Sequence, residues 1–174
     1  LQTFAALAVS SIAGYGFEIY HDKAKDTVMA ILMLAMMVPF VAVLVPLFQM
    51  FTKAKLINSW TGFILPSIAT PFLIMYFRNS ARSFPRDTLE AARIDGLNEF
   101  QIFIRMFIPM MKPTYASAAT ITFMGAWNAY LWPKVVMQTN EAITMPMLVA
   151  NTMGGYVIDY GVVMAAVTIC SLPT

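Results

Sequence analysis

Five long apolar stretches alternate with short charged segments along the chain. About 20 consecutive apolar residues in a helix cross the hydrocarbon core of a bilayer, and the longest of these stretches reach that length. The pattern therefore predicts an all-α fold, a polytopic transmembrane helical bundle. The spans are expected at about 1–19, 27–52, 60–78, 113–133 and 160–174.

Prolines divide two of the stretches. Pro39 and Pro46 fall in the second stretch, and Pro66 and Pro71 fall in the third. Because proline removes a backbone donor and its ring crowds the preceding turn, we expect kinks in the second span and a broken or interfacial first half of the third. From Lys134 onward polar and apolar residues mix, which predicts an external loop with an amphipathic or re-entrant helix. The last stretch is short, so we expect a bundle truncated at both ends.

The polar segment 79–112 separates the third and fourth spans and predicts two short helices joined by a turn. Ser83 is placed to cap the first helix. Gly96 suits a left-handed residue after its C-terminus. Asn98 can cap the second helix, with Gln101 completing a capping box. We expect a compact helix–turn–helix that meets water and protein partners.

Glu90-Ala91-Ala92, followed by Gly96 and then by Pro109, resembles the EAA loop of permease subunits of ATP-binding-cassette (ABC) importers. The family pattern is Glu-Ala-Ala, three residues, glycine, nine residues, then Ile-x-Leu-Pro. Here the last element is Met-Phe-Ile-Pro, ending at Pro109, which keeps the length of the motif with two conservative departures. Placement between two predicted spans makes the motif specific.

The flanking residues extend this resemblance over nearly the whole chain. Ile64-Leu65-Pro66, Phe84-Pro85 and Trp127-Asn128 are similar to the sugar-importing branch. The resemblance implies the fold of a type I ABC importer permease, similar to the maltose-type second permease subunit. It also implies the residues that couple to the ATPase: Glu90, Ala91, Ala92, Asp95, Gly96 and Pro109.

The resemblance further implies a set of partners. Separate ATPase subunits would bind ATP and Mg, a related second permease subunit would pair with this chain, and an extracytoplasmic solute-binding protein would dock outside. The chain itself would move a sugar or oligosaccharide by alternating access, without a cofactor and without being an enzyme. The phosphate-binding pattern Gly-x-x-x-x-Gly-Lys-Ser/Thr does not occur in these 174 residues.

Composition favours a membrane protein independently of the motif. Apolar residues make up 59% of the chain and charged residues 11%, against roughly 25% charged residues in soluble domains. A net charge of +2, with no basic cluster among aromatics, argues against nucleic acid as a partner. The sequence contains one cysteine, Cys170, which excludes an intrachain disulfide within these residues. It contains one histidine, His21, which excludes a metal site built from several histidines.

The basic residues predict the orientation. If the charged turn 21–26 and the polar segment 79–112 share one side, most of the lysines and arginines lie on that side. The positive-inside rule then places it in the cytoplasm of a bacterial or archaeal cytoplasmic membrane. The acids nearest the spans, Glu18 and Asp159, fall at span ends, which favours interfacial placement over an ion path.

The candidate solute path lies near the end of the fourth span. Sugars bind to aromatic faces with amide donors and acceptors between them, and Trp127, Asn128 and Tyr130 combine these groups. An aromatic belt at the bilayer surface explains the aromatics equally well, especially Trp132, but explains the asparagine poorly. Gln49 in the second span is the alternative position for the path.

Three other functions stay open. An importer permease for a non-sugar solute would share every feature above. An intramembrane enzyme would need a buried nucleophile and base, paired acids or metal ligands, which the long apolar stretches do not offer. A scaffolding subunit would share the topology but would not need the spacing of the glutamate, alanines and glycine.

Overall fold

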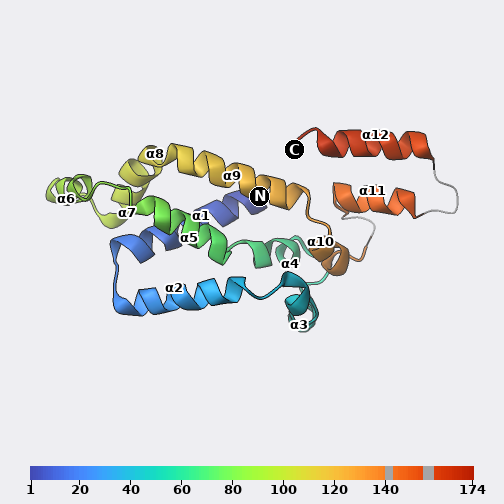
Figure 1. Cartoon of the computed structure of the whole chain (residues 1–174), viewed down its shortest axis with the longest axis horizontal. Helices are drawn as coiled ribbons and strands as arrows, with labels where there is room; N and C mark the ends of the chain where they lie inside the picture. The colour runs from blue at the N-terminus through green and yellow to red at the C-terminus, as the bar shows by residue number, and fades with distance from the viewer. Residues whose placement is uncertain (140–142, 155–158) are drawn as a thin grey trace. The chain divides into compact units, whose positions relative to one another are not determined.

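The computed structural model describes residues 1–139, 143–154 and 159–174, and all regular structure in these ranges is helical (Figure 1). The all-α fold is therefore confirmed. In chain order the elements are α1 (Gln2–Ile19), α2 (Lys23–Met36), α3 (Phe40–Lys53), α4 (Trp60–Ile64), the 3₁₀ turn η1 (Leu65–Ser67), α5 (Pro71–Ala81), α6 (Arg86–Ile94), α7 (Glu99–Ile102), the π-helix η2 (Phe103–Phe107), α8 (Ile108–Met110), α9 (Lys112–Trp127), α10 (Leu131–Val136), α11 (Met145–Met153) and α12 (Tyr160–Ser171).

The chain divides into two compact units. The first unit comprises Leu1–Val38 and Ser67–Thr120, and the second comprises Pro39–Pro66 and Ile121–Thr174. The polar segment lies in the first unit. The candidate solute-path residues lie in the second.

Proline sets the helix boundaries in the second and third apolar stretches. Pro39 adopts an extended conformation as the N-cap of α3, Pro66 lies in the 3₁₀ turn η1, and Pro71 occupies the first turn of α5, where its missing N–H has no partner to lose. No single helix in the described ranges is both long and apolar enough to cross a bilayer. Two pairs, α2 with α3 and α4–η1 with α5, reach that length and composition together across a bend.

The core of the first unit starts from the close packing of α1 against α5, which run side by side (Figure 1). Small residues on successive turns of α1, Ala6, Ser10 and Gly14, are all buried. A Cβ atom on Gly14 would lie 2.6 Å from Cβ of Phe77 and 2.7 Å from the backbone nitrogen of Arg78. Glycine therefore permits the close helix contact at this turn.

Aromatic rings fix the polar segment to α1. Tyr15 packs edge-on against Phe103 and Phe107, with ring centroids 5.2 and 4.9 Å apart, and the two phenylalanines stack on each other at 5.5 Å. Phe103 and Phe107 bound η2, where the N–H of Ile108 donates to the carbonyl of Phe103. The second half of the polar segment is thus anchored by a buried aromatic cluster.

The second unit has its own core around Trp132. The indole packs edge-on against Phe51, with centroids 5.2 Å apart, and its Nε1 donates to the carbonyl of Gly62 at 3.2 Å. Trp132 is only 7% exposed, and Val136 is fully buried beside it. Trp132 is therefore a core residue of this unit, and the aromatic-belt explanation is wrong for it.

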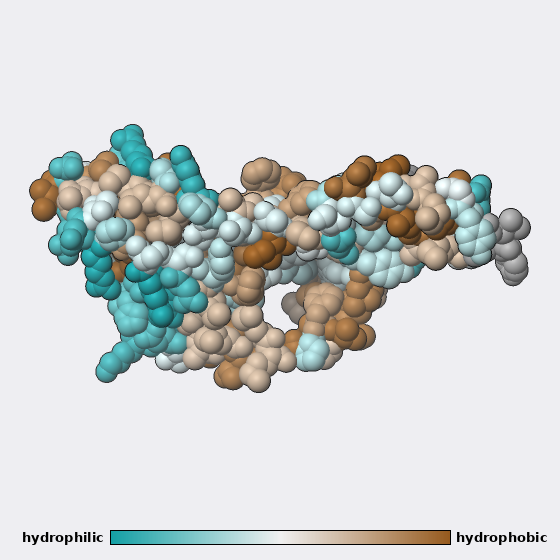
Figure 2. All heavy atoms as spheres, turned by 45° about the horizontal axis from the view of Figure 1, so that its top comes forward, coloured by the Kyte–Doolittle hydropathy of each residue, from teal (hydrophilic) through white to brown (hydrophobic). Residues whose placement is uncertain are grey.

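Hydrophilic residues gather at one end of the first unit, over α6 and the α1–α2 turn (Figure 2). Away from this end the helices expose large apolar side chains. On α2 these are Val28, Ile31, Met33, Leu34 and Met36. Apolar side chains along a helix that buries little of its own surface are typical of contact with lipid or with another membrane-embedded chain.

Candidate functional site

The first helix of the polar segment begins without a side-chain cap. Pro85 is the N-cap of α6, and no side chain accepts from the first-turn N–H groups. The Ser83 hydroxyl instead donates to the carbonyl of Ser80 at 2.6 Å. The expectation that Ser83 caps this helix is therefore wrong, because Ser83 belongs to the turn that closes α5, where its N–H also donates to Ser80.

The turn between α6 and α7 has the predicted geometry. Gly96 has a φ of +79°, and its N–H donates to the carbonyl of Arg93 at 3.1 Å. Asn98 and Gln101 form a complete capping box, with the Asn98 side chain accepting from the Gln101 N–H at 2.8 Å and the Gln101 side chain accepting from the Asn98 N–H at 3.0 Å. Both helix-turn signals are confirmed.

The α6 helix has a buried face and an exposed face. Leu89 and Ala92 are buried in the cluster that contains Tyr15. Glu90 and Ala91 are exposed, so Ala91 is the alanine of the motif that a partner can contact. The exposed residues Glu90, Ala91, Ile94, Asp95, Gly96 and Phe100 form a surface that we call the α6–α7 tip. Pro109, which ends the motif, is also exposed but lies on α8, after η2.

Two apolar side chains on the α6–α7 tip were missed in the sequence. Ile94 is 86% exposed and Phe100 is 67% exposed. Both are large apolar residues within a charged segment, and neither shares the buried face that contains Leu89 and Ala92. These two properties together could have identified them from the sequence. Exposed large apolar residues among charged ones are typical of a protein-binding surface.

Charged groups on the tip and beside it differ in whether they are paired. Arg93 Nε donates to Glu99 Oε1 at 2.8 Å, which links α6 to α7. The Glu99 carboxylate raises the pKa of Arg93. Glu90 and Asp95 have no ion pair with any residue that the structure describes. Their carboxylates are therefore available to a partner.

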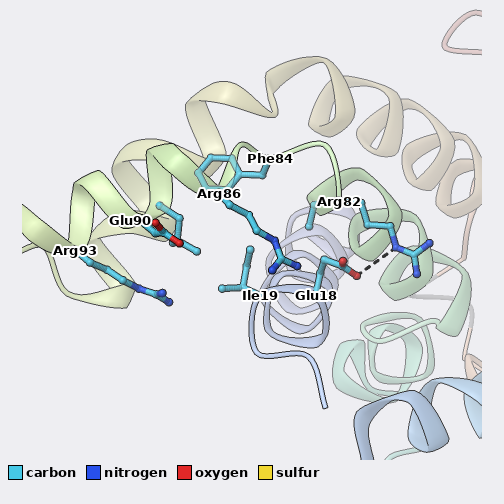
Figure 3. Close-up of a pocket in the computed structure, with 9 residues that line it drawn as sticks. Glu18, Ile19, Arg82, Phe84, Arg86, Glu90 and Arg93 are labelled. Carbon is cyan, nitrogen blue, oxygen red and sulfur yellow. Dashed lines mark hydrogen bonds and ion pairs between the residues drawn. The ribbon is translucent and has the colours of Figure 1, made fainter. Parts of the chain in front are cut away.

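A crevice of about 130 Å³ lies behind the tip, between the ends of α1 and α5 and the inner side of α6. Arg82 Nε donates to Glu18 Oε2 at 3.3 Å on one side of this crevice (Figure 3). Arg86 extends from α6 toward Glu18 and Ile19. Glu90 lines the same crevice, so the first residue of the motif faces both the crevice and the solvent.

A buried arginine, for which the sequence predicted no role, joins three helices beside this crevice. Arg78 on α5 is 6% exposed. Its Nε lies 3.3 Å from Glu18 Oε2 on α1, and its Nη2 lies 2.6 Å from Asp26 Oδ1 on α2. The other oxygen of Asp26 lies 2.9 Å from His21 Nε2. A lone arginine at the end of an apolar stretch, with acids at the ends of two others, was the available signal.

The candidate solute-path residues do not lie on one helix. The α9 helix ends at Trp127, residues Asn128 to Tyr130 are not helical, and α10 begins at Leu131. Helical spacing therefore does not determine the relative directions of the side chains across this stretch. A continuous helix would place the ring of Pro133 against the carbonyl of Ala129, so the chain stops and restarts with the proline in a first turn.

The structure places the four solute-path candidates differently. Trp127 Nε1 donates to the carbonyl of Cys170 on α12 at 2.9 Å. Asn128 lines an open crevice of about 340 Å³ whose other walls come from α11 and the C-terminal part of the chain. Tyr130 is exposed at the N-cap of α10. Gln49 is exposed on α3 and is not among the residues that line this crevice.

Comparison with known proteins identifies the family. The family described as binding-protein-dependent transport system inner membrane component matches residues 6–174. The lactose transport system permease protein LacG of Rhizobium radiobacter is 42% identical over 99% of this chain and 63% of its own length. The arabinooligosaccharides transport system permease protein AraQ of Bacillus subtilis is 34% identical over 98% of this chain and 61% of its own length.

A solved structure supports the same fold. The bacterial ABC transporter that imports the acidic polysaccharide alginate contains a chain that matches with a TM-score of 0.77 and 23% identity, over 96% of this chain and 62% of that one. The present chain thus spans about three fifths of the length of the proteins it matches. It belongs to the family of inner membrane components of binding-protein-dependent transport systems.

Proposed function

We propose that this chain is the membrane-spanning permease part of an ATP-driven importer, and that it carries a sugar or oligosaccharide by alternating access. ATP and Mg are bound by separate ATPase subunits, a related permease subunit pairs with it, and a solute-binding protein delivers the solute from outside. The α6–α7 tip lies on the cytoplasmic side. A difference in binding energy between conformational states then does the work, rather than chemistry in this chain.

The observation that carries this proposal is the α6–α7 tip itself. The helix behind it is anchored by the buried cluster around Tyr15. The tip exposes Ile94 and Phe100 and also Glu90, whose carboxylate forms no ion pair with the residues that the structure describes. A rigid projection with apolar anchors and a free charge fits a cleft on another protein. The ATPase subunit is the partner that the motif implies.

The docking role is tested by reversing the charge at Glu90. We expect Glu90→Lys in the full-length protein to reduce co-purification of the ATPase subunit by about tenfold. The substitution replaces a carboxylate that can pair with a basic group of the partner by an ammonium group that repels it. Membrane insertion should be unchanged, since Glu90 is exposed and outside the predicted spans. Lys23→Glu is the control, because it reverses an exposed charge of the same magnitude, in the opposite sense, on α2. Equal ATPase recovery with Glu90→Lys and wild type would refute the docking role.

The sugar proposal is supported by the relatives named for lactose and for arabinooligosaccharides. It is tested by purifying the associated solute-binding protein and measuring its thermal stability with a panel of sugars. A specific ligand raises the melting temperature once its concentration exceeds the dissociation constant, and the stabilisation grows with the logarithm of that concentration. Stabilisation by a non-sugar solute, with no response to any sugar, would favour the alternative importer.

A further inference from the structure

We propose that Arg78 is a positioning residue that makes α1 and α2 move with α5 and the α6–α7 tip as one block. This inference rests on the proposed function, because it explains how a displacement of the tip by an ATPase subunit reaches the predicted membrane spans. It assigns a coupling role to a residue outside the recognised motif.

The guanidinium group contacts two helices with two different nitrogens. Nε is directed to Glu18 on α1 and Nη2 to Asp26 on α2. A planar fork can hold two acceptors in fixed directions, whereas the single ammonium of lysine cannot reproduce both contacts from one position. The geometry therefore makes arginine specifically suited to this position.

Burial makes these contacts costly to break. The Arg78 side chain is 7% exposed and Glu18 is 15% exposed. A buried charge is costly unless it stays paired, so separating either helix from Arg78 would leave its guanidinium without a partner away from water, even though Asp26 itself is 46% exposed. Arg82 contacts the same Glu18 oxygen at the same 3.3 Å, but its side chain is 59% exposed, so water can replace its partner readily.

The α2 helix depends on this arginine more than α1 does. Six residues of α1 are buried, and Gly14 brings α1 into close contact with α5. By contrast, Met29 is the one residue of α2 that is buried. The ion pair from Arg78 to Asp26 is therefore a principal attachment of α2 to the first unit.

The connection from Arg78 to the α6–α7 tip is short and packed. α5 ends at Ala81 and α6 begins at Arg86. Ala81 and Phe84 are buried in the same cluster as Leu89 and Ala92 of α6. A displacement of α6 is thus passed to the end of α5 by packed side chains, and from there by Arg78 to α2.

Hydrogen–deuterium exchange of the assembled full-length transporter, with and without ATP and Mg, tests this inference. In the wild type we expect ATP to change exchange both in α6 and in residues 23–36. In Arg78→Lys and Asp26→Asn, the ATP-dependent change in residues 23–36 should fall by about threefold or more, while the change in α6 persists. Arg82→Lys is the matched control and should keep both responses.

The readout separates coupling from stability. If Arg78 only stabilised the fold, the variants would exchange faster with and without ATP but would keep the difference between the two states. Asp26→Asn keeps the proposal testable if Arg78→Lys does not fold, since Asp26 is 46% exposed and asparagine still offers an acceptor oxygen.

The two failures are distinguishable. A wild-type α6 that shows no response to ATP would overturn the proposed function and this inference with it. A wild-type α6 that responds while residues 23–36 do not, or a full response of residues 23–36 in both variants, would overturn this inference alone.

Discussion

Gly14 is the residue at which the packing of the first unit is tightest. A methyl group there would lie 2.6 to 2.9 Å from Phe77, Arg78 and Ile74, and two of the three contacted atoms belong to the backbone. We expect Gly14→Ala to lower the stability of the full-length protein by about 1–3 kcal/mol, because the helices must separate. Thermal unfolding in detergent measures this.

Gly16 provides the control for that substitution. It lies on the same helix, and nothing lies within 4 Å of a Cβ built there. Alanine is a better helix former than glycine by about 0.8–1 kcal/mol, so Gly16→Ala should be neutral or stabilising. Equal melting temperatures for the two variants would contradict the close contact of α1 with α5.

Asp26 predicts how stability responds to acid. The hydrogen bond from Arg78 holds the pKa of Asp26 below its ordinary value, which is about 3.9 in an unfolded chain. A carboxyl whose pKa is depressed in the folded state stabilises the protein above the unfolded value, and this contribution is lost as the pH falls through the folded value. We therefore expect the wild type to lose more stability than Asp26→Asn when the pH is lowered from 5 to below about 3.9.

Melting temperatures of both proteins in detergent across this range provide the measurement. If the two proteins showed parallel curves of melting temperature against pH, the ion pair of Asp26 with Arg78 would not stabilise the folded state. The position of the pair could not be predicted from the sequence, because Arg78 and Asp26 are brought together by the folding of distant segments. Their residue types and their place at the ends of apolar stretches were visible, but their proximity was not.

At the scale of elements, the α6–α7 turn offers a test of backbone geometry alone. Gly96 has a positive φ, and a Cβ there would meet no atom within 4 Å. Substitutions should therefore act through the left-handed conformation, which costs L-residues about 1–2 kcal/mol and is tolerated best by asparagine. We expect co-purification of the ATPase subunit to decrease in the order glycine, asparagine, alanine, valine. An order that follows side-chain volume without the advantage of asparagine would contradict this.

Local signals predicted this turn well, and their failures elsewhere have local causes. Gly96 and the Asn98–Gln101 capping box depend on neighbouring residues only, so the sequence contains the information that decides them. Ser83 is a residue type that often caps helices, but α6 has Pro85 as its N-cap, and Ser83 lies in the preceding turn. The break between α9 and α10 was not predicted, because the stretch that contains it carries no charge and was interpreted as one span.

At the scale of the whole molecule, Asn128 tests where the solute passes. It lines the crevice against α11 and the C-terminal part of the chain. Its side-chain amide nitrogen donates to the carbonyl of Met124 at 3.0 Å, and its oxygen has no hydrogen bond to the part of the chain that the structure describes. We expect Asn128→Leu to reduce uptake of the identified solute by about tenfold, since a polar contact is replaced by an apolar group. Assembly and basal ATP hydrolysis should not change.

Asn79→Leu is the comparison for this variant, because it removes an exposed amide from α5 in the first unit. If Asn128→Leu took up solute at the wild-type rate, the path would not include Asn128, and Gln49 on α3 or the partner permease would be the next positions to test. The sequence drew attention to Asn128 because an amide in an apolar stretch is unusual. It did not predict the crevice, which depends on α11 and α12 packing together.

The π-helix at Phe103–Phe107 contributes to the rotational phase of the α9 helix, which follows it after α8 and the turn residue Met111. The α9 helix is apolar around most of its circumference, so its own sequence provides little information about which side should face the core. Each residue advances a helix by about 100°, and a π turn has the effect of one inserted residue. Removing one residue from η2 would restore α-helical spacing and turn α9 by that angle, carrying Ala118 away from Leu73 and Phe77 in the core of the first unit. The orientation of α9 thus depends in part on a five-residue stretch that lies outside it.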